Sequence, residues 1–105
     1  MLKVRQKNGE EVYAWQFGMD DSHEYIQFLL NSGYMLSYTG NGENKPHKYI
    51  IDNDDGEQLM LPGDWLIILD VIYEPGLISE YIDYIECVVV KDYYFKNNYE
   101  ILEEI

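Results

Sequence analysis

The sequence predicts an α+β protein: a small, twisted, mainly antiparallel sheet with one main helix at about residues 21–32 and a second short helix at about 77–85. Short apolar segments alternate with turn residues along most of the chain, which is typical of antiparallel strands. The stretch "DDSHEYIQFLLNSG" has apolar residues at helical spacing. A length of 105 residues suits a single domain, residues 1–105, with one modest core.

The first two segments are expected to form a β-hairpin. "KNGE" separates the apolar residues Leu2 and Val4 from the segment "EVYAWQF". Its Asn8-Gly9 dipeptide is typical of a tight turn between antiparallel strands. Lysine and arginine alternate with other residues in the first strand, as on a solvent-facing side.

The main helix follows. Asp21 or Ser22 can cap its start, where acidic side chains also favour the positive end of the helix dipole. Gly33 can end it with a positive φ. The apolar positions expected to face the core are Tyr25, Ile26, Leu29 and Leu30. "YMLSY" is then a predicted strand, and "TGNGENKPHK" a polar loop.

"YIIDNDDGEQLML" predicts two strands around an Asp-Gly turn. Its acidic residues also invite a calcium-loop interpretation, but the spacing does not fit. An EF-hand loop places glycine after its third acidic ligand and a bidentate glutamate at position 12. Counted from Asp52, Gly56 comes one residue early and the twelfth position is Gly63. We therefore expect a hairpin and no metal site.

In "LPGDWLI", Pro62 and Gly63 supply the backbone angles of a type II turn. Asp64 can accept backbone hydrogen bonds across that turn, and Trp65 begins the predicted buried strand "WLIILDVIY". This interpretation makes Asp64 and Trp65 structural residues.

The last third of the chain predicts a helix, a strand, a helical turn and a final strand. "EPGLISEYIDYIE" has apolar residues at i, i+3, i+4 and i+7 (Ile78, Tyr81, Ile82 and Ile85), which favours the short helix, although tyrosine and isoleucine also suit a strand. "CVVV" is a predicted buried strand. "KDYYFKNNYEIL" predicts one helical turn capped by Asp92 and then a strand through Tyr99 and Ile101.

Charge is the unusual property of this sequence. Twenty acidic residues and seven basic ones give a formal net charge of −13. Residues 49–90 hold ten carboxylates and no Lys or Arg. Direct binding to nucleic acid requires a basic footprint, so it is disfavoured, and so is binding to anionic membranes. A basic protein surface is the natural complement, whereas the alternative is an acidic face that only keeps the protein in solution.

Several segments resemble a family of small phage and prophage proteins. The family carries a "VEAxQF"-like strand, a "PGDWII" turn and strand, and a C-terminal "DxFxxxYE" segment. Matching residues here are Val12, Ala14, Gln16 and Phe17; Pro62, Gly63, Asp64, Trp65 and Ile67; and, loosely, Asp92, Tyr94 or Phe95, Tyr99 and Glu100. The chain departs from the family between Val71 and Tyr84, in an acidic, tyrosine-rich insertion. The resemblance implies phage origin and fold, and it implies no biochemical activity.

The sequence contains no recognisable catalytic motif. It lacks a glycine-rich phosphate loop, a nucleophile elbow and HExxH. His23 and His47 are isolated, and Cys87 opens an apolar run typical of an inert buried thiol. A single cysteine, the absence of a signal segment at the start, and a longest apolar run of five residues predict a protein of the host cytoplasm without a cofactor.

The leading hypothesis is therefore a phage-encoded, non-enzymatic inhibitor that occupies the basic groove of a host nucleic-acid-binding protein as a nucleic-acid mimic. Anti-CRISPR proteins resemble this profile of small, acidic phage proteins, which makes a CRISPR effector one candidate partner. The alternatives are a virion or assembly protein whose acidity is surface chemistry, and a small hydrolase acting through paired carboxylates.

The candidate partner-binding residues are eight of the ten acids of residues 52–86 together with one tyrosine. Tyrosines interleaved with carboxylates can meet a cationic groove, although packing in the core is the commoner role of any single tyrosine. Helical phase points Tyr81 toward the core and leaves Tyr84 as the candidate anchor, while Tyr13, Tyr25, Tyr34 and Tyr99 are expected in the core. The partner-binding set is Asp52, Asp54, Asp55, Glu57, Glu74, Glu80, Asp83, Tyr84 and Glu86.

Overall fold

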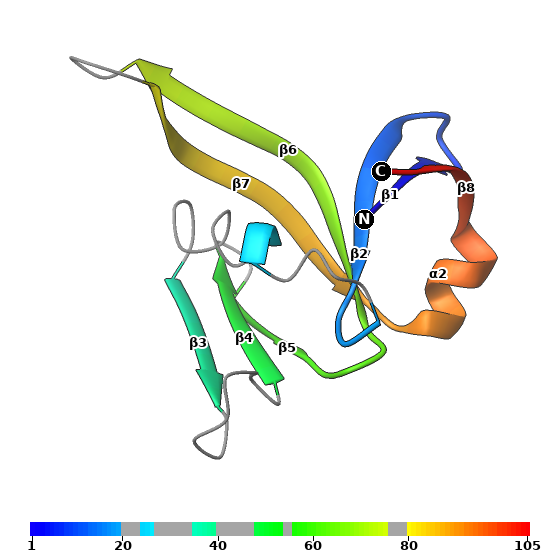
Figure 1. The fold of residues 1–105 in the computed structure, drawn as a ribbon, viewed down its shortest axis with the longest axis horizontal. Coiled ribbons are helices and arrows are strands. Elements are labelled where there is room, and N and C mark those ends of the chain that lie inside the picture. Colours follow the sequence, from blue (N-terminus) through cyan, green and yellow to red (C-terminus); the bar gives the residue numbers. More distant parts are fainter. Residues whose placement is uncertain (20–23, 27–34, 40–47, 54–55, 76–79) are drawn as a thin grey trace.

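The computed structural model describes residues 1–19, 24–26, 35–39, 48–53, 56–75 and 80–105, and it describes the backbone alone for 35–39, 48, 52–53, 72–75 and 80–84. Within these residues the strands form two antiparallel sheets (Figure 1). The five-stranded sheet has the order β7 (Glu80–Val90), β6 (Trp65–Pro75), β2 (Glu11–Gln16), β1 (Leu2–Gln6) and β8 (Tyr99–Glu104). The three-stranded sheet consists of β3 (Met35–Thr39), β4 (Lys48–Asn53) and β5 (Gly56–Met60).

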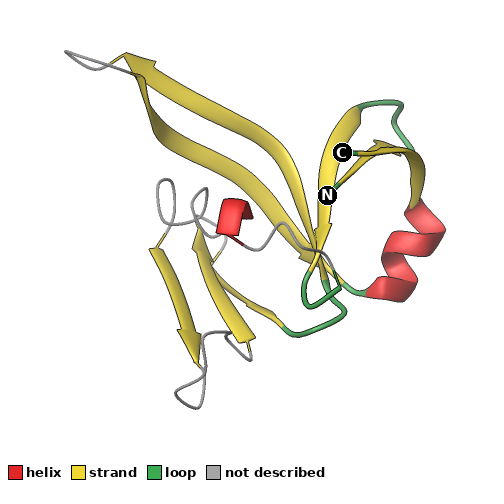
Figure 2. Ribbon diagram, in the orientation of Figure 1, coloured by secondary structure: helices red, strands yellow, loops and turns green. Residues whose placement is uncertain are grey.

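The structure combines antiparallel strands with short helices, which confirms the predicted α+β class. Helix α2 (Asp92–Asn98) connects β7 to β8, and residues 24–26 are also helical. The three-stranded sheet and α2 lie on opposite sides of the five-stranded sheet (Figure 2). None of the helices in the described part is long and apolar enough to cross a membrane.

Alternation along the central strands produces two cores, because successive side chains of a strand point to opposite faces. On β6, Leu66 and Ile68 face the three-stranded sheet, while Trp65 and Ile67 face α2. The first core joins Trp15 and Phe17 to Tyr49 of β4, with ring centroids 6.3 and 4.9 Å from the tyrosine. The second core closes over Phe95 of α2.

The predicted strands and the first hairpin are confirmed. β1 pairs with β2 across the loop that contains Gly9, which has φ +91°. The Gly9 N–H donates to the Gln6 carbonyl at 2.9 Å, and the Glu10 N–H donates to Asn8 Oδ1 at 3.0 Å. The pairing of β4 with β5 extends as far as Asn53 and Gly56, as expected for the "DNDDGE" hairpin.

The predicted helix at 77–85 is wrong. Residues 80–90 form β7, an eleven-residue strand that pairs with β6 along most of its length. The segment is rich in tyrosine and isoleucine, which fit a pleated sheet. A helix of two turns is marginal alone, whereas the strand satisfies its backbone against β6. Residues 76–79 lie outside the described residues.

The main helix is confirmed where it is described. Residues 24–26 are helical and Ile26 is buried, while the remainder of 21–32, with its proposed caps and Gly33, lies outside the described residues. Asp92 is not the cap of α2, because Lys91 occupies the N-cap position and Asp92 is in the first turn.

Two tyrosines expected in the core are exposed. Tyr13 is 43% exposed and Tyr25 is 50% exposed, whereas Tyr99 is half-buried against the second core. Tyr13 is on the same face of β2 as Trp15, but the buried cluster on that face includes Trp15 and not Tyr13. Tyr34 lies outside the described residues.

Candidate functional site

The "LPGDW" segment forms the turn that the sequence predicts. Gly63 has φ +92°, the positive value that a type II turn requires at its third residue. The Asp64 N–H donates to the Leu61 carbonyl at 2.9 Å and closes the turn. Two further backbone hydrogen bonds join the turn to Phe17. The Gly63 N–H donates to the Phe17 carbonyl at 2.8 Å, and the Phe17 N–H donates to the Asp64 carbonyl at 3.0 Å.

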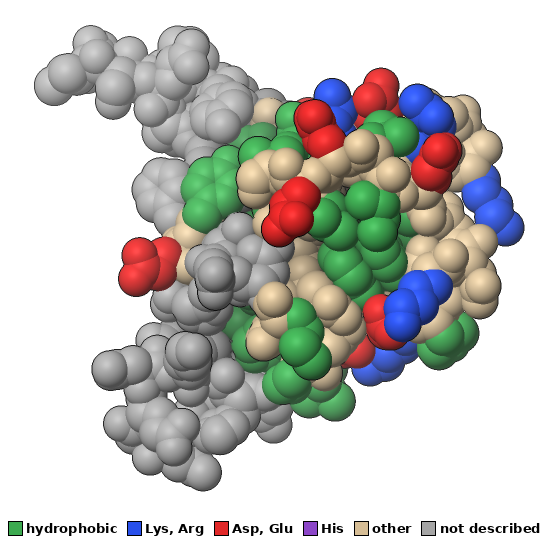
Figure 3. Space-filling model, turned by 45° about the vertical axis from the view of Figure 1, so that its right-hand side comes forward, with side chains coloured by type: hydrophobic (Ala, Val, Ile, Leu, Met, Phe, Trp, Pro, Cys, Tyr) green, Lys and Arg blue, Asp and Glu red, His purple; other side chains and the backbone are tan. Residues whose placement is uncertain are grey.

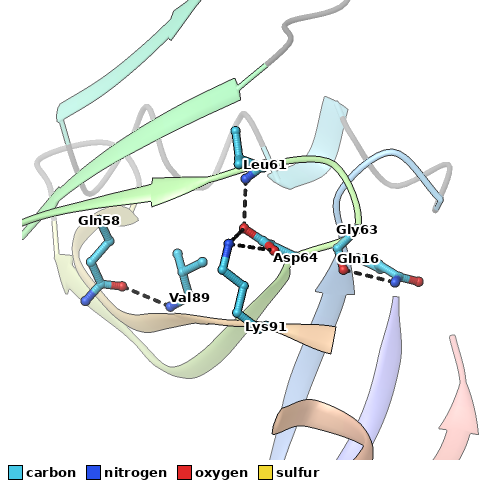
Figure 4. Close-up of polar contacts among 7 residues, drawn as sticks. All are labelled: Gln16, Gln58, Leu61, Gly63, Asp64, Val89 and Lys91. Carbon is cyan, nitrogen blue, oxygen red and sulfur yellow. Dashed lines mark hydrogen bonds and ion pairs between the residues drawn. The ribbon is translucent and has the colours of Figure 1, made fainter. Parts of the chain in front are cut away.

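Asp64 is a buried carboxylate with 6% of its surface exposed. Its Oδ2 accepts from the Leu61 N–H at 2.9 Å and lies 2.9 Å from Lys91 Nζ, which is also 3.2 Å from Oδ1 (Figure 4). The Gln16 side chain donates to the Gly63 carbonyl at 3.1 Å in the same region. Asp64 therefore joins the β5–β6 turn to Lys91, the N-cap residue of α2.

Trp65 follows Asp64 in the chain and packs in the second core, where it also contacts α2. Its ring stacks on Phe95 with centroids 3.7 Å apart and planes 9° apart. Its indole N–H donates to Asp92 Oδ1 at 2.9 Å, and Lys96 forms an ion pair with the other oxygen at 2.9 Å. Hydrogen bonds from Lys96 and Trp65 hold the pKa of Asp92 below its ordinary value. The pair Asp64–Trp65 is structural, as the sequence predicted.

The predicted partner-binding residues lie on two hairpins. Asp52 of β4 is opposite Glu57 of β5, Glu74 is on β6, and Glu80, Asp83, Tyr84 and Glu86 are on β7. Asp54 and Asp55 lie outside the described residues, and among the whole set side chains are described only for Glu57 and Glu86, both exposed. The hairpins meet where the Val89 N–H of β7 donates to Gln58 Oε1 of β5 at 2.9 Å (Figure 4).

Most of the β7 residues belong to a projection that we call the β6–β7 arm, residues 69–75 and 80–86. β2 pairs with β6 as far as Tyr13 and Ile68. Beyond Ile68, β6 continues to pair with β7 (Figure 1). The β6–β7 register shifts between Ile68 and Asp70 and again between Ile72 and Tyr73. Such irregularities increase the local twist of a hairpin.

At the base of the arm, Asp70 and Glu86 are directly opposite each other, and both are exposed. Like charges at opposite positions of an antiparallel pair are unfavourable. Within the described residues, neither carboxylate has a Lys or Arg at ion-pair distance, and the Asp70 side chain accepts only from the Val71 N–H, at 2.9 Å. Sequence analysis counted Asp70 among the acids but left it out of the site, although a charge inside the run "WLIILDVIY" marks an exposed position.

The opposite half of the molecule has a different charge arrangement. Acidic and basic side chains alternate over the half that carries β1, β8 and α2 (Figure 3). Three ion pairs are described there: Lys3–Glu11 at 3.5 Å, Arg5–Glu100 at 3.2 Å and Lys96–Asp92 at 2.9 Å. Ion pairs therefore offset part of the acidic charge on this half, whereas none is described for the Asp70 and Glu86 carboxylates of the arm.

A cleft of about 450 Å³ lies where the arm separates from β2, and we call it the fork cleft. β2 contributes Glu11 and Tyr13, the helical residues contribute Tyr25, and β6 contributes Ile68 to Val71. Met1 and Ile105 complete its lining. The sequence carries no signal for this cleft, because both tyrosines were predicted to pack in the core.

The described residues offer little for catalysis. Cys87 is buried, and burial, with a smaller contribution from the nearby Glu86, raises the pKa of its thiol to about 12. It is therefore an inert thiol, as predicted. Among the residues with described positions, His, Cys, Asp and Glu form no group of three or more that could hold a metal ion. Both histidines lie outside the described residues.

Comparisons with protein-family models, curated proteins and solved structures find no match to this chain. The resemblance to small phage proteins stays a hypothesis.

Proposed function

We propose that this protein is a non-enzymatic inhibitor that binds the basic groove of a host nucleic-acid-binding enzyme and occupies it in place of nucleic acid. The observation that supports this most strongly is the distribution of charge: residues 49–90 hold ten carboxylates, of which Asp64 is buried, and no Lys or Arg, within a net charge of −13. Acidic surfaces of this kind complement basic ones and accelerate association with them.

The arm supports the proposal further, because its charge arrangement is unfavourable for the isolated protein. The opposed carboxylates of Asp70 and Glu86 repel each other, whereas Glu11 of β2, Glu100 of β8 and Asp92 of α2 are each paired with a cation. Contact with a basic groove would relieve this repulsion. The free protein is therefore preorganised for a cationic partner at the base of the arm.

An anti-CRISPR role is the specific form of this proposal. It rests on the size, the acidity and the resemblance to phage proteins, and a CRISPR effector offers a deep basic channel for a nucleic-acid heteroduplex. A mimic would present carboxylates from residues 52–86 in place of phosphates, with Tyr84 as an aromatic anchor.

The proposal is tested by affinity capture from nuclease-treated bacterial lysate. The immobilised protein should retain a nucleic-acid-binding enzyme that DNA or RNA oligonucleotides release at constant ionic strength, and the free protein should inhibit that enzyme. Association should weaken steeply with added salt, because exposed charges are screened. Retention that nucleic acid cannot displace would overturn mimicry, and capture of virion components alone would favour an assembly role.

A further inference from the structure

We propose that the fork cleft is a binding site for a single arginine side chain of the partner. The inference rests on the proposed function for the identity of that partner, and on the cleft itself for the chemistry. Neither the carboxylates alone nor the tyrosines alone would define such a site, and the cleft brings both together over an apolar wall.

The lining of the fork cleft combines three kinds of side chain. Tyr13 and Tyr25 are large aromatic residues that remain 43% and 50% exposed beside it. Ile68, Leu69 and Val71 supply apolar surface from β6. Glu11 and Asp70 add carboxylates from the two strands that separate at this point. The cleft is thus apolar along its wall, carries the Glu11 and Asp70 carboxylates, and is also lined by the terminal residues Met1 and Ile105.

This combination matches an arginine side chain better than other cations. The aliphatic stem of arginine covers apolar surface while its charged end stays near solvent. The planar guanidinium stacks on aromatic rings and pairs with carboxylates through two hydrogen bonds. Lysine offers a strongly hydrated point charge and lacks the planar group, so it should bind more weakly.

Both carboxylates are exposed and can accept a new partner. Asp70 has no Lys or Arg at ion-pair distance among the described residues. Glu11 is 3.5 Å from Lys3, but both side chains are substantially exposed, at 48% and 35%. Exposed ion pairs of this kind contribute little and exchange readily. A guanidinium can therefore take the place of Lys3.

The test uses N-acetyl-arginine amide as the probe and N-acetyl-citrulline amide, its neutral isostere, as the control ligand. NMR titration should show saturable shifts of the residues that line the fork cleft with the arginine compound and none with the citrulline compound. Asp70→Asn and Tyr13→Leu should each weaken binding by about tenfold, equivalent to about 1.4 kcal/mol.

Matched variants control for charge, aromatic content and folding. Glu100→Gln removes one exposed carboxylate on β8, and Tyr93→Leu removes a tyrosine on α2 that is 71% exposed. Neither should affect binding. Tyr13→Phe keeps the ring and should bind as the wild type does, which separates the loss of stacking in Tyr13→Leu from a loss of folding.

Equal shifts with the citrulline compound, or binding that survives both Asp70→Asn and Tyr13→Leu, would overturn the arginine site. If the cleft fails this test while lysine substitutions on the arm still abolish capture of the enzyme, the proposed function stands without it. If the cleft binds arginine but the captured protein binds no nucleic acid, the proposed function fails and the arginine site stands.

Discussion

Asp64 and Asp70 are six residues apart in one segment, yet the fold uses them in opposite ways. Asp64 is 6% exposed, accepts the Leu61 N–H and pairs with Lys91. Asp70 is exposed, accepts one bond from the adjacent residue and is opposite Glu86. The first carboxylate holds three segments together, whereas the second adds repulsion to the fold.

This difference separates acids that stabilise the protein from acids available to a partner. A buried carboxylate must be hydrogen-bonded, so its partners define a structural role. An exposed carboxylate opposite a second one adds nothing to folding and creates local negative potential. The distinction yields predictions in which the turn variants lose stability and the arm variants lose binding.

The largest effect is expected for Trp65→Ala. The indole is 7% exposed and stacks on Phe95, so its removal leaves a cavity between β6 and α2. The free energy of unfolding should fall by about 3–5 kcal/mol, measured by chemical denaturation. A small loss of stability together with abolished partner binding would move Trp65 into the functional site.

Asp64→Ala should cost about 1.5–3 kcal/mol, because the Leu61 N–H loses a charged acceptor. The control is Lys91→Met, which removes the ion pair alone. Lys91 is 53% exposed, so that variant should lose less than about 1 kcal/mol. Equal losses in the two variants would show that the ion pair, and not the turn, is the stabilising contact.

Gly63→Val should lower the free energy of unfolding by about 1–3 kcal/mol, because a β-branched residue resists the φ of +92°. An added Cβ would meet no atom within 4 Å, so the cost comes from the backbone alone. Gly63→Asn is the control and should lose less, since asparagine tolerates positive φ. An unchanged melting temperature in Gly63→Val would exclude a role for the turn geometry.

The smallest effect is expected for Asp70→Lys, and it has the opposite sign. The new lysine is opposite Glu86 and converts a repulsive pair into an attractive one. The protein should gain about 0.2–1 kcal/mol of stability at low salt, with a smaller gain at high salt. A loss of stability in this variant would mean that Asp70 has a structural role.

Features set by a few neighbouring residues were predictable from the sequence. Asn8-Gly9, the Pro62-Gly63 turn and the alternation along β6 each carry their own backbone preference, and all appear as predicted. The segment 77–85 shows the limit of this approach. Its helical spacing is genuine, but pairing with β6, the preceding strand of the same hairpin, determines the strand.

The candidate site was less predictable than the fold. The acidity of residues 52–86 is visible in composition, but the opposition of Asp70 and Glu86 depends on the register of two strands. The exposure of Tyr13 depends on which elements pack over its face of β2, which no local pattern reveals. The fork cleft exists only because β6 leaves β2 after Ile68.

The most direct test compares two double variants of equal net charge. Asp70→Lys with Glu86→Lys changes the arm, while Glu10→Lys with Glu104→Lys changes two exposed acids of the β1–β2 loop and β8. Affinity for the captured enzyme is measured against salt concentration. We expect the arm variant to bind weakly with a shallow salt dependence and the control to bind as the wild type does. Equal affinities and equal salt slopes in the two variants would contradict a localised binding surface on the arm.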